Sequence, residues 1–415
     1  MKAKMSYNET AFIGIAMFQK ENTPMIVNVE FFDREALNNV ITCIHFHVDK
    51  VIFFGYREVM EARRDSTAGF LREYCGVSKT SFHEVSHSDP KAVFQTMQKV
   101  IEQELEKGED IFFDITGGES MILAVFGMMA MKYRLPVYQY DVSKDRLMEY
   151  VMPGAKKLSE TAQELGKTPG IDEFIEIQGG KVNHSLQKSH KFSDDEEFEE
   201  DVRKIWQVVE RHWESWNSFS DFLKGNMVPD EDLRVNKKTI TLMGALSEAP
   251  SSFNSIGKLN RMVEELAEAG ALLDVEYSNA SYRFRFKNQK IKDCLWESGS
   301  MLELHVYLDE KEHSDDCRVG VHLDWDQVLH SQVGSDVMNE IDVLSLKGNM
   351  LTFISCKSGK LGSSQSLYAL YELQTVAERF GGRYARKKLV IMHPMNRIYQ
   401  ERAAEMGIEV VCLHS

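Results

Sequence analysis

The chain has 415 residues, 49 Lys and Arg against 64 Asp and Glu, a formal net charge of −15, and 43% apolar residues. At about 100–200 residues per domain, this length predicts two or three domains, and the apolar content is too high for a mainly disordered chain. The acidic balance excludes a histone-like or generally basic nucleic-acid binder, because such proteins neutralise phosphates with an excess of cations. It leaves a nuclease open, because a local basic strip and a bound metal can supply the positive field.

Neither a membrane span nor a disulfide framework is indicated. Crossing a bilayer takes about 18 apolar residues, and the nearest stretch, Met121 to Met131, is interrupted by Gly127. The short apolar run near the N-terminus lacks the layout of a signal peptide. The six cysteines are scattered without a CxxC pair, which fits a reduced setting. We therefore expect a cytoplasmic protein with no membrane partner.

Residues 25–151 alternate short apolar runs with helical windows. This alternation predicts a parallel sheet with helices on both faces, and right-handed crossovers make it a Rossmann-like, doubly wound domain. The expected strands are Met25–Val29, Val51–Phe54, Ser81–Val85, Ile111–Ile115 and Val137–Tyr140, and the expected helices are Arg34–His45, Glu58–Tyr74, Pro90–Leu105 and Glu119–Tyr133.

The composition changes after Pro153, and a dense acidic run, SDDEEFEED, spans Ser193–Asp201. Such a run is more typical of a solvated helix face or a linker than of a metal site. Helices are expected around Asp201–His212 and Lys238–Leu246. A further helix, Leu259–Gly270, precedes two short strands at Ala271–Val275 and Tyr282–Phe286.

This helix and strand pair resemble a winged-helix module, which serves either as a DNA reader or as a structural spacer. Arg283, Arg285 and Lys287 are candidates for phosphate contacts. The acidic neighbourhood and the lack of a basic recognition helix favour the spacer.

A different α/β order begins near Trp296. We therefore expect three parts: residues 1–155, a central helical or winged-helix segment at 156–295, and a C-terminal domain at 296–415. The expected elements of the last part are helix Ser300–Tyr307, strands Arg318–Leu323, Ile341–Leu346 and Met350–Cys356, helix Ser366–Phe380, strand Leu389–Met392, helix Arg397–Met406 and strand Glu409–Leu413.

The first informative motif is the segment DITGGES, Asp114 to Ser120, between a buried strand and an apolar helix. Consecutive glycines expose amide N–H groups, and the helix N-terminus adds partial positive charge, so the turn is suited to phosphate. It would lie beyond the carboxyl ends of the strands, where open sheets bind ligands. The alternative is that the glycines only permit a tight turn. The helix that follows is apolar on nearly every face, which predicts core or a subunit interface.

The turn and its neighbours resemble the CARF domains of CRISPR-associated ancillary proteins, which are Rossmann-like, dimeric sensors of cyclic oligoadenylate. Thr116, Gly117 and Gly118 match the family's TGG turn, whereas Glu119 and Ser120 stand where a basic residue is often found. The resemblance implies a homodimer that binds cyclic oligoadenylate, and the expected ligand is the cyclic tetra-adenylate.

By topology, two further loops complete this ligand pocket. Phe31, Phe32 and Asp33 follow the first strand, and Tyr56 and Arg57 follow the second. Phe31 or Tyr56 would either stack on adenine or serve as core aromatics.

The second motif pairs the segment NEID, ending at Asp342, with ISCK, ending at Lys357. The residues Gly348 and Asn349 between them are typical of a two-residue hairpin turn. That turn places Asp342 opposite Ser355 and Glu340 opposite Lys357, with all four side chains on one face. A three-residue loop would break this geometry.

Two chemical interpretations are open for this face. One carboxylate opposite one lysine is an ion pair worth a few tenths of a kcal/mol. Two carboxylates beside a lysine suit Mg²⁺ or Mn²⁺, which can activate a water while the lysine stabilises charge at a scissile phosphate.

The order of elements resembles the PD-(D/E)XK nuclease fold, and NEID with ISCKSG resembles the nuclease half of the Card/Can group of CARF-linked CRISPR nucleases. The resemblance implies that Asp342 binds metal, that Lys357 is catalytic and that Glu303 is the glutamate of the first helix. Ser355 stands where many relatives carry glutamate. We expect Glu340 and Glu303, with a water on Ser355 and the carbonyl of Cys356, to complete the metal shell.

The sequence therefore predicts a cyclic oligoadenylate-activated, Mn²⁺- or Mg²⁺-dependent nuclease that cuts single-stranded or duplex DNA, RNA or both. The alternative is a ligand-sensing DNA-binding regulator with a degraded nuclease domain. A basic patch is a candidate for phosphate contacts; it comprises Arg379, Arg383, Arg386, Lys387 and Lys388.

Overall fold

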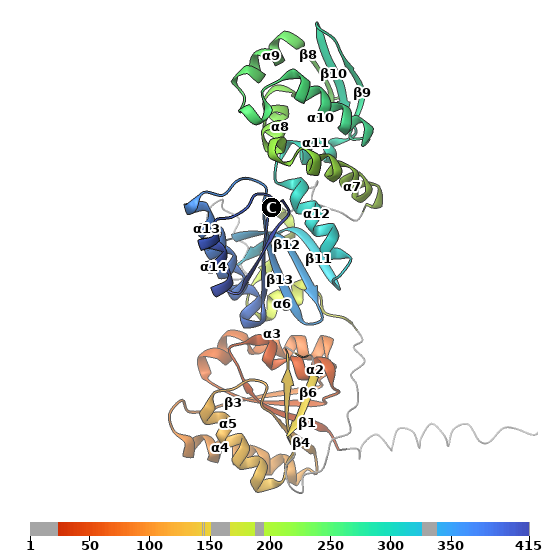
Figure 1. The fold of residues 1–415 in the computed structure, drawn as a ribbon. Coiled ribbons are helices and arrows are strands. Elements are labelled where there is room, and N and C mark those ends of the chain that lie inside the picture. The colour runs from red at the N-terminus through yellow and green to blue at the C-terminus, as the bar shows by residue number, and fades with distance from the viewer. Residues whose placement is uncertain are drawn as a thin grey trace, which may run out of the picture. The chain divides into compact units, whose positions relative to one another are not determined.

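The computed structural model describes residues 24–142, 144, 146–150, 167–186, 195–325 and 338–414. The chain divides into two compact units, one ending at Pro169 and one beginning at Gly170 (Figure 1).

The N-terminal unit contains a six-stranded sheet in the order β3-β2-β1-β4-β5-β6. All its neighbouring strands are parallel except β5 and β6, which confirms the predicted Rossmann-like fold. Its elements are β1 (Ile26–Phe32), η1 (Ala36–Asn39), α2 (Ile41–His45), β2 (Lys50–Gly55), α3 (Arg57–Tyr74), β3 (Lys79–Glu84), α4 (Pro90–Glu106), β4 (Asp110–Asp114), α5 (Ser120–Tyr133), β5 (Val137–Asp141) and β6 (Arg146–Tyr150).

Strand order reverses between β1 and β4, so the loops that follow these two strands meet at one edge of the sheet. In an open α/β sheet this reversal is where ligands bind. The segment DITGGES follows β4, and Asp33 follows β1. The topology therefore gathers these two predicted loops.

Two details of the N-terminal unit differ from the prediction. The expected helix Arg34–His45 is a 3₁₀ turn followed by the five-residue α2. Here Asn39 binds the backbone of Asp33 in both directions, through Nδ2 to the carbonyl and through Oδ1 from the N–H. Such side-chain bonds compete with a helix. Strand β6 was not predicted.

The C-terminal unit contains two sheets, a six-stranded one in the order β15-β14-β13-β12-β11-β7 and a three-stranded one in the order β8-β10-β9. Helices α13 and α14 cover one face of the larger sheet, and α12 packs on β11 and β12 from the other side (Figure 1). The elements are α6 (Ile171–Ile177), β7 (Lys181–Val182), η2 (His184–Leu186), α7 (Glu196–Arg211), α8 (Trp213–Asn226), β8 (Arg234–Lys238), α9 (Thr239–Glu248), η4 (Ser251–Phe253), α10 (Ile256–Glu268), β9 (Leu272–Tyr277), β10 (Ser281–Phe286), α11 (Gln289–Trp296), α12 (Ser300–Lys311), β11 (Asp316–Asp324), β12 (Met338–Lys347), β13 (Met350–Lys357), α13 (Ser363–Gly381), η5 (Gly382–Tyr384), β14 (Arg386–Ile391), α14 (Arg397–Glu405) and β15 (Ile408–Cys412).

The middle of this unit has the order helix, strand, two helices, two strands, from α8 to β10, which is the order expected of a winged-helix module. One apolar core runs from this module into the nuclease-like sheet and includes Trp216, Phe286, Leu302, Val343 and Ile354. The two parts are therefore packed together as one body.

The short strand β7 pairs with β11 and so belongs to the C-terminal sheet, although the prediction placed it in the central segment. The boundaries predicted between the three parts of the chain, at residues 155/156 and 295/296, otherwise stay predictions.

From Asp195 onward the acidic run begins helix α7, and residues 193–194 lie outside the described part. Asp195 caps the helix by accepting from the N–H groups of Glu197 and Phe198. Acidic side chains in a first turn complement the helix dipole. Within its described residues this run belongs to a helix, which agrees with the predicted helix face and not with a linker, although the helix begins at Glu196 and not near Asp201 as predicted. No helix in the described ranges is long and apolar enough to cross a bilayer.

The buried carboxyl of Glu30 gives the N-terminal unit a pH-dependent stability. Glu30 lies beside Asp114 in the β1–β4 register, and burial, followed by the charge of Asp114, raises the pKa of Glu30 well above its usual value. Burial raises the pKa of Asp114 as well. A carboxyl whose folded-state pKa is raised contributes stability that is present below its unfolded pKa of about 4.3 and is lost as the pH rises through the folded pKa.

We expect Glu30→Gln to flatten this dependence, because the amide has no proton to lose. The measurement is hydrogen-exchange protection of the β1 and β4 peptides in the full chain, corrected for intrinsic exchange, at about pH 5 and about pH 8. Protection should fall less with pH in the variant than in the parent. Glu106→Gln, on the exposed end of α4, is the control. An equal pH effect in parent and Glu30→Gln would contradict the prediction.

Candidate functional site

The β12–β13 hairpin has the predicted register. Lys347 pairs with Met350, and the pairing continues to Val343 and Ile354. Gly348 adopts φ 60°, the left-handed conformation that a tight turn requires. Asp342 and Ser355 are the next residues of the two strands, and their side chains are hydrogen-bonded to each other.

The carboxylate of Asp342 is bound by three groups of the opposite strand. Its Oδ2 accepts from the backbone N–H of Cys356 at 2.6 Å and from Oγ of Ser355 at 3.1 Å. The ammonium of Lys357 lies 3.5 Å from the same oxygen. Asp342 and Lys357 therefore lie on the same side of the sheet, and all these contacts use one carboxylate oxygen.

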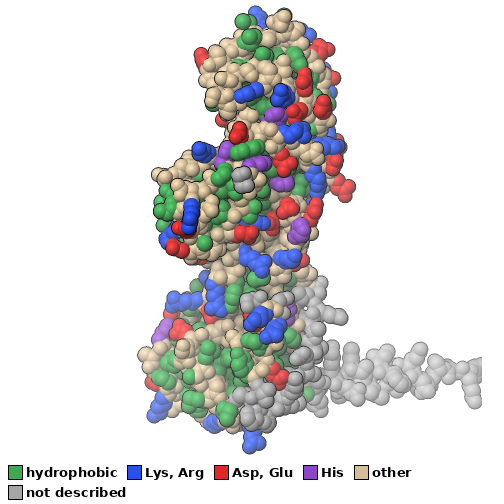
Figure 2. Space-filling model, in the orientation of Figure 1, with side chains coloured by type: hydrophobic (Ala, Val, Ile, Leu, Met, Phe, Trp, Pro, Cys, Tyr) green, Lys and Arg blue, Asp and Glu red, His purple; other side chains and the backbone are tan. Residues whose placement is uncertain are grey.

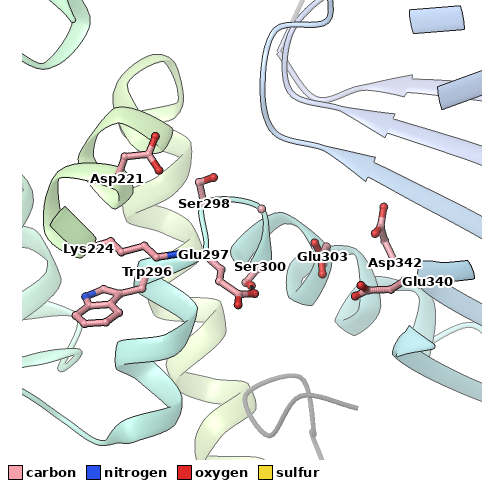
Figure 3. A pocket seen from close by; sticks show the side chains of 10 residues that line it. Asp221, Lys224, Trp296, Glu297, Ser298, Ser300, Glu303, Glu340 and Asp342 are labelled. Carbon is pink, nitrogen blue, oxygen red and sulfur yellow. Dashed lines mark hydrogen bonds between the residues drawn. The ribbon is translucent and has the colours of Figure 1, made fainter. Parts of the chain in front are cut away.

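A pocket of about 320 Å³ gathers the other predicted carboxylates beside Asp342. Glu303 enters from α12, and Glu340 and Asp342 enter from β12. Figure 3 shows these three side chains next to one another at one end of the pocket. The residues expected from two separate motifs thus reach one cavity.

The donor chemistry of this pocket fits a divalent cation such as Mg²⁺ or Mn²⁺, which prefers carboxylate oxygens. Within the described ranges, no three His, Cys, Asp or Glu side chains are already close enough to hold one ion together. Glu303 and Glu340 have flexible side chains that line the same cavity as Asp342. Ion binding would therefore draw these carboxylates inward.

The residues that line the opposite wall of this pocket were not predicted from the sequence. Asp221 and Lys224 reach it from α8, Trp296 from the end of α11, and Glu297 from the connection between α11 and α12. Helix α8 itself was not predicted. Its apolar spacing, Trp216, Phe219 and Leu223, was the available signal.

The predicted basic patch is largely occupied by contacts within the chain. Arg379 donates to the carbonyls of Gln178, Gly179 and Trp325. Lys387 donates to the carbonyl of Met406, and Lys388 forms an ion pair with Glu310. The patch is therefore mainly structural, which the clustering of charges in the sequence did not reveal.

Two of the three cations proposed for the wing are also engaged, whereas Arg283 is exposed. Lys287 forms ion pairs with Glu197 and Asp201, and Arg285 with Asp274. On the side of the C-terminal unit shown in Figure 2, acidic and basic side chains are interspersed. This distribution supports the spacer interpretation of the winged-helix module.

In the N-terminal unit, the TGG turn packs directly on the loop after β1. The N–H of Gly118 donates to Oδ2 of Asp33 at 2.8 Å. A Cβ on Gly117 would lie 2.6 Å from the same oxygen, and Gly118 adopts φ 124°. Both glycines are therefore needed for this close approach. Thr116 is buried, and its Oγ1 accepts from the N–H of Tyr140.

Of the remaining residues predicted to contact the ligand, three lie at the surface, and Tyr56 is hydrogen-bonded to one of them. Glu119 and Ser120 are exposed, and Arg57 forms an ion pair with Glu84. The hydroxyl of Tyr56 donates to Glu119 at 2.9 Å, and burial, followed by this hydrogen bond, raises the pKa of Tyr56 to about 12.

The aromatic candidates pack inside the N-terminal unit. The ring of Tyr56 stacks on His87 and contacts Phe31 edge to face. Phe32 is fully buried against Phe53 and Phe82. Phe32 is therefore a core residue whose side chain presents no surface to a ligand.

Comparisons with known proteins agree with both predicted halves. Residues 293–414 match the family model described as "Card1-like, endonuclease domain". The chain is similar in structure to protein VC1899 from Vibrio cholerae, with 18% identity, 94% of both chains covered and a TM-score of 0.69. It is also similar to Can2 from Sulfobacillus thermosulfidooxidans, solved in complex with cyclic tetra-adenylate, with 16% identity, 92% of both chains covered and a TM-score of 0.59. No curated protein matches the sequence.

The chain thus has the fold of Can2 and of protein VC1899. Its residues 293–414 form a Card1-like endonuclease domain. The resemblance drawn from the TGG turn and the NEID/ISCK pair is confirmed.

The hydroxyl of Thr116 supports the TGG turn, and this role is testable. Thr116→Val would leave the buried N–H of Tyr140 without an acceptor, at a cost of about 1–3 kcal/mol. Thr116→Ser keeps the acceptor and is the matched control. Amide-exchange protection of the peptide that contains β5 should fall in Thr116→Val only. Equal protection in the two variants would show that the hydrogen bond is dispensable.

Proposed function

We propose that this protein is a nuclease of type III CRISPR defence that requires a divalent metal and is activated by cyclic oligoadenylate. The observation that carries the proposal is the set of contacts on Asp342. Its carboxylate and the ammonium of Lys357 lie 3.5 Å apart on one side of the sheet, and Asp342 lines one pocket together with Glu303 and Glu340. The Card1-like endonuclease match over residues 293–414 supports the reaction class.

Asp342, Glu303 and Glu340 would hold a Mn²⁺ or Mg²⁺ ion, with the carbonyl of Cys356 as a further ligand. The ion would supply Lewis-acid activation of a water and neutralise charge on the phosphodiester. The N–H of Cys356 and Oγ of Ser355 would orient Asp342, because both bind its Oδ2. The other carboxylate oxygen, Oδ1, would then be the one that binds the ion. Lys357 would bind a non-bridging oxygen of the scissile phosphate and stabilise the charge that develops there.

The N-terminal unit would bind the messenger at the TGG turn. Can2, which has the same fold, was solved with cyclic tetra-adenylate, and this supports the same activator here. Gly117 to Ser120, together with Asp33 and Arg57, form the candidate contact surface, whereas Thr116 and Tyr56 are buried. A symmetric ring would sit on the two-fold axis of a homodimer and act on both subunits at once. Activation requires that the ring bind the cutting-competent arrangement more tightly than the resting one.

The direct test is cleavage of single-stranded DNA, single-stranded RNA and supercoiled plasmid by the purified full chain with Mn²⁺, with and without cyclic tetra-adenylate. We expect cleavage that needs both the metal and the messenger. Lys357→Ala should lower the rate about 100-fold or more, as expected for loss of a group that stabilises transition-state charge. Lys347→Ala, at the turn end of the same hairpin, should cut like the parent. A parent chain that cuts none of the three substrates would overturn the proposal.

A second experiment tests whether Glu340 replaces the glutamate that relatives carry at position 355. Glu340→Ala should weaken Mn²⁺ binding, measured by titration calorimetry, and lower cleavage by about tenfold or more, because a metal ligand is lost. Ser355→Glu in the Glu340→Ala background should restore part of both. Glu248→Ala, on the exposed end of α9, is the control. Intact Mn²⁺-dependent cleavage in Glu340→Ala would show that Glu340 does not compensate.

A further inference from the structure

Helix α8 of the winged-helix module carries a row of three polar residues and one tryptophan, to which the sequence analysis assigned no function. We call this row the polar stripe. Trp213, Asn217, Asp221 and Lys224 recur at intervals of four, four and three residues, so they share one side of the helix. The neighbouring stripe, which includes Trp216, is buried in the core. The polar stripe is about 16 Å long at 1.5 Å per residue.

One end of this stripe lies at the edge of the catalytic sheet. The indole of Trp213 stacks on His414, with ring centres 4.7 Å apart and planes 12° apart, and contacts His393 at 4.8 Å. These histidines follow β15 and β14. His393 comes one residue after Met392, whose N–H donates to the carbonyl of Lys357. The aromatic cluster of Trp213, His393 and His414 therefore adjoins the strand end that carries Lys357.

The middle and the far end of the stripe adjoin the same active site. A Cβ on Gly359, two residues after Lys357, would lie 3.6 Å from Nδ2 of Asn217. Asp221 and Lys224 line the pocket that also holds Asp342 (Figure 3). Helix α8 thus runs along the catalytic residues on both sides of Lys357.

Several groups on this surface are chemically unused. Lys224 is the one cation among the ten pocket-lining residues, five of which are carboxylates. It makes no hydrogen bond or ion pair with any residue that the structure describes. Oδ1 of Asn217 and Nε2 of His414 are buried and have no hydrogen-bond partner within the described ranges. An ammonium, an amide and an aromatic platform in one row match the chemistry of a nucleic-acid strand.

We infer that this side of α8 binds single-stranded nucleic acid, with Trp213, His393 and His414 stacking on an unpaired base and Lys224 contacting a backbone phosphate. The inference rests on the proposed nuclease function and names its substrate class. Aromatic side chains bind unpaired bases because the π-face is exposed only when the strand is open. The stripe has room for about five stacked nucleotides at about 3.4 Å each.

The test is binding of a fluorescein-labelled oligothymidylate, measured by fluorescence anisotropy in the full chain carrying Lys357→Ala, with Mn²⁺ and cyclic tetra-adenylate present. The matching oligouridylate and the annealed duplex are the comparison ligands. Trp213→Ala should weaken binding of both single strands about tenfold, in line with the loss of one stacked base. It should leave duplex binding within about twofold of the parent.

Lys224 is tested by salt dependence, which a purely structural role would not change. Lys224→Ala should lower the slope of log affinity against log salt by about 0.7, the value for one phosphate contact on a single strand, whereas Lys224→Arg should keep the slope. Lys238→Ala, an exposed lysine of β8, is the control and should bind like the parent.

Tryptophan fluorescence gives a reading that does not depend on the alanine variant folding well. Oligothymidylate should quench the emission of the parent, and Trp213→Phe should lose part of that quenching although four of the five tryptophans remain. The inference is overturned if Trp213→Ala and Lys224→Ala both bind single strands within about twofold of the parent, or if the duplex loses as much affinity as the single strands.

The two proposals fail in different ways. A chain that binds oligonucleotide through α8 but cuts nothing would overturn the nuclease and leave the binding site. A chain that cuts normally when Trp213 and Lys224 are replaced would overturn the α8 site alone.

Discussion

The proposed catalytic arrangement depends on one local interaction, the hydrogen bond from the backbone N–H of Cys356 to the carboxylate of Asp342. This bond exists only in the observed hairpin register, because a shift by one residue would turn Asp342 to the other face of the sheet. The register is in turn set by the two-residue turn, in which Gly348 adopts a left-handed conformation. A backbone requirement at the tip of the hairpin therefore decides which side chains meet at its far end.

The charge of the pocket bears on the proposed action of an acidic protein on a polyanion. Five carboxylates line the cavity, and one lysine, Lys224, opposes them there, with Lys357 beside Asp342. Carboxylates gathered in one place repel both one another and a phosphodiester. A bound divalent cation removes both repulsions at once, since it is the largest local charge in such a site. In the proposed nuclease, the positive field is therefore local, and a net charge of −15 is no obstacle.

The sequence predicted those features that repeat with a regular period. Alternating residues defined the hairpin, and strand–helix alternation defined the Rossmann-like sheet. Features that depend on packing between distant segments were missed. Helix α8 presents ordinary polar residues, such as Asn217 and Lys224, and only its packing places them beside the sheet that carries Asp342. Conversely, clustered basic residues such as Arg379 and Lys388 suggested a binding surface, yet their partners, Gln178 and Glu310, are distant in sequence.

The TGG turn shows how packing and ligand binding can use the same groups. Asp33 accepts from the N–H of Gly118 and so occupies an amide that could otherwise bind a phosphate. A hydrogen bond to a charged acceptor is worth about 1.5–3 kcal/mol. An anionic messenger that binds this amide would have to displace the carboxylate of Asp33. The two negative charges would also repel each other. Asp33 also fixes its own loop through Asn38 and Asn39. Messenger binding at the amide would therefore be coupled to a rearrangement of the loop after β1, which is the kind of two-state element that activation at a distance requires.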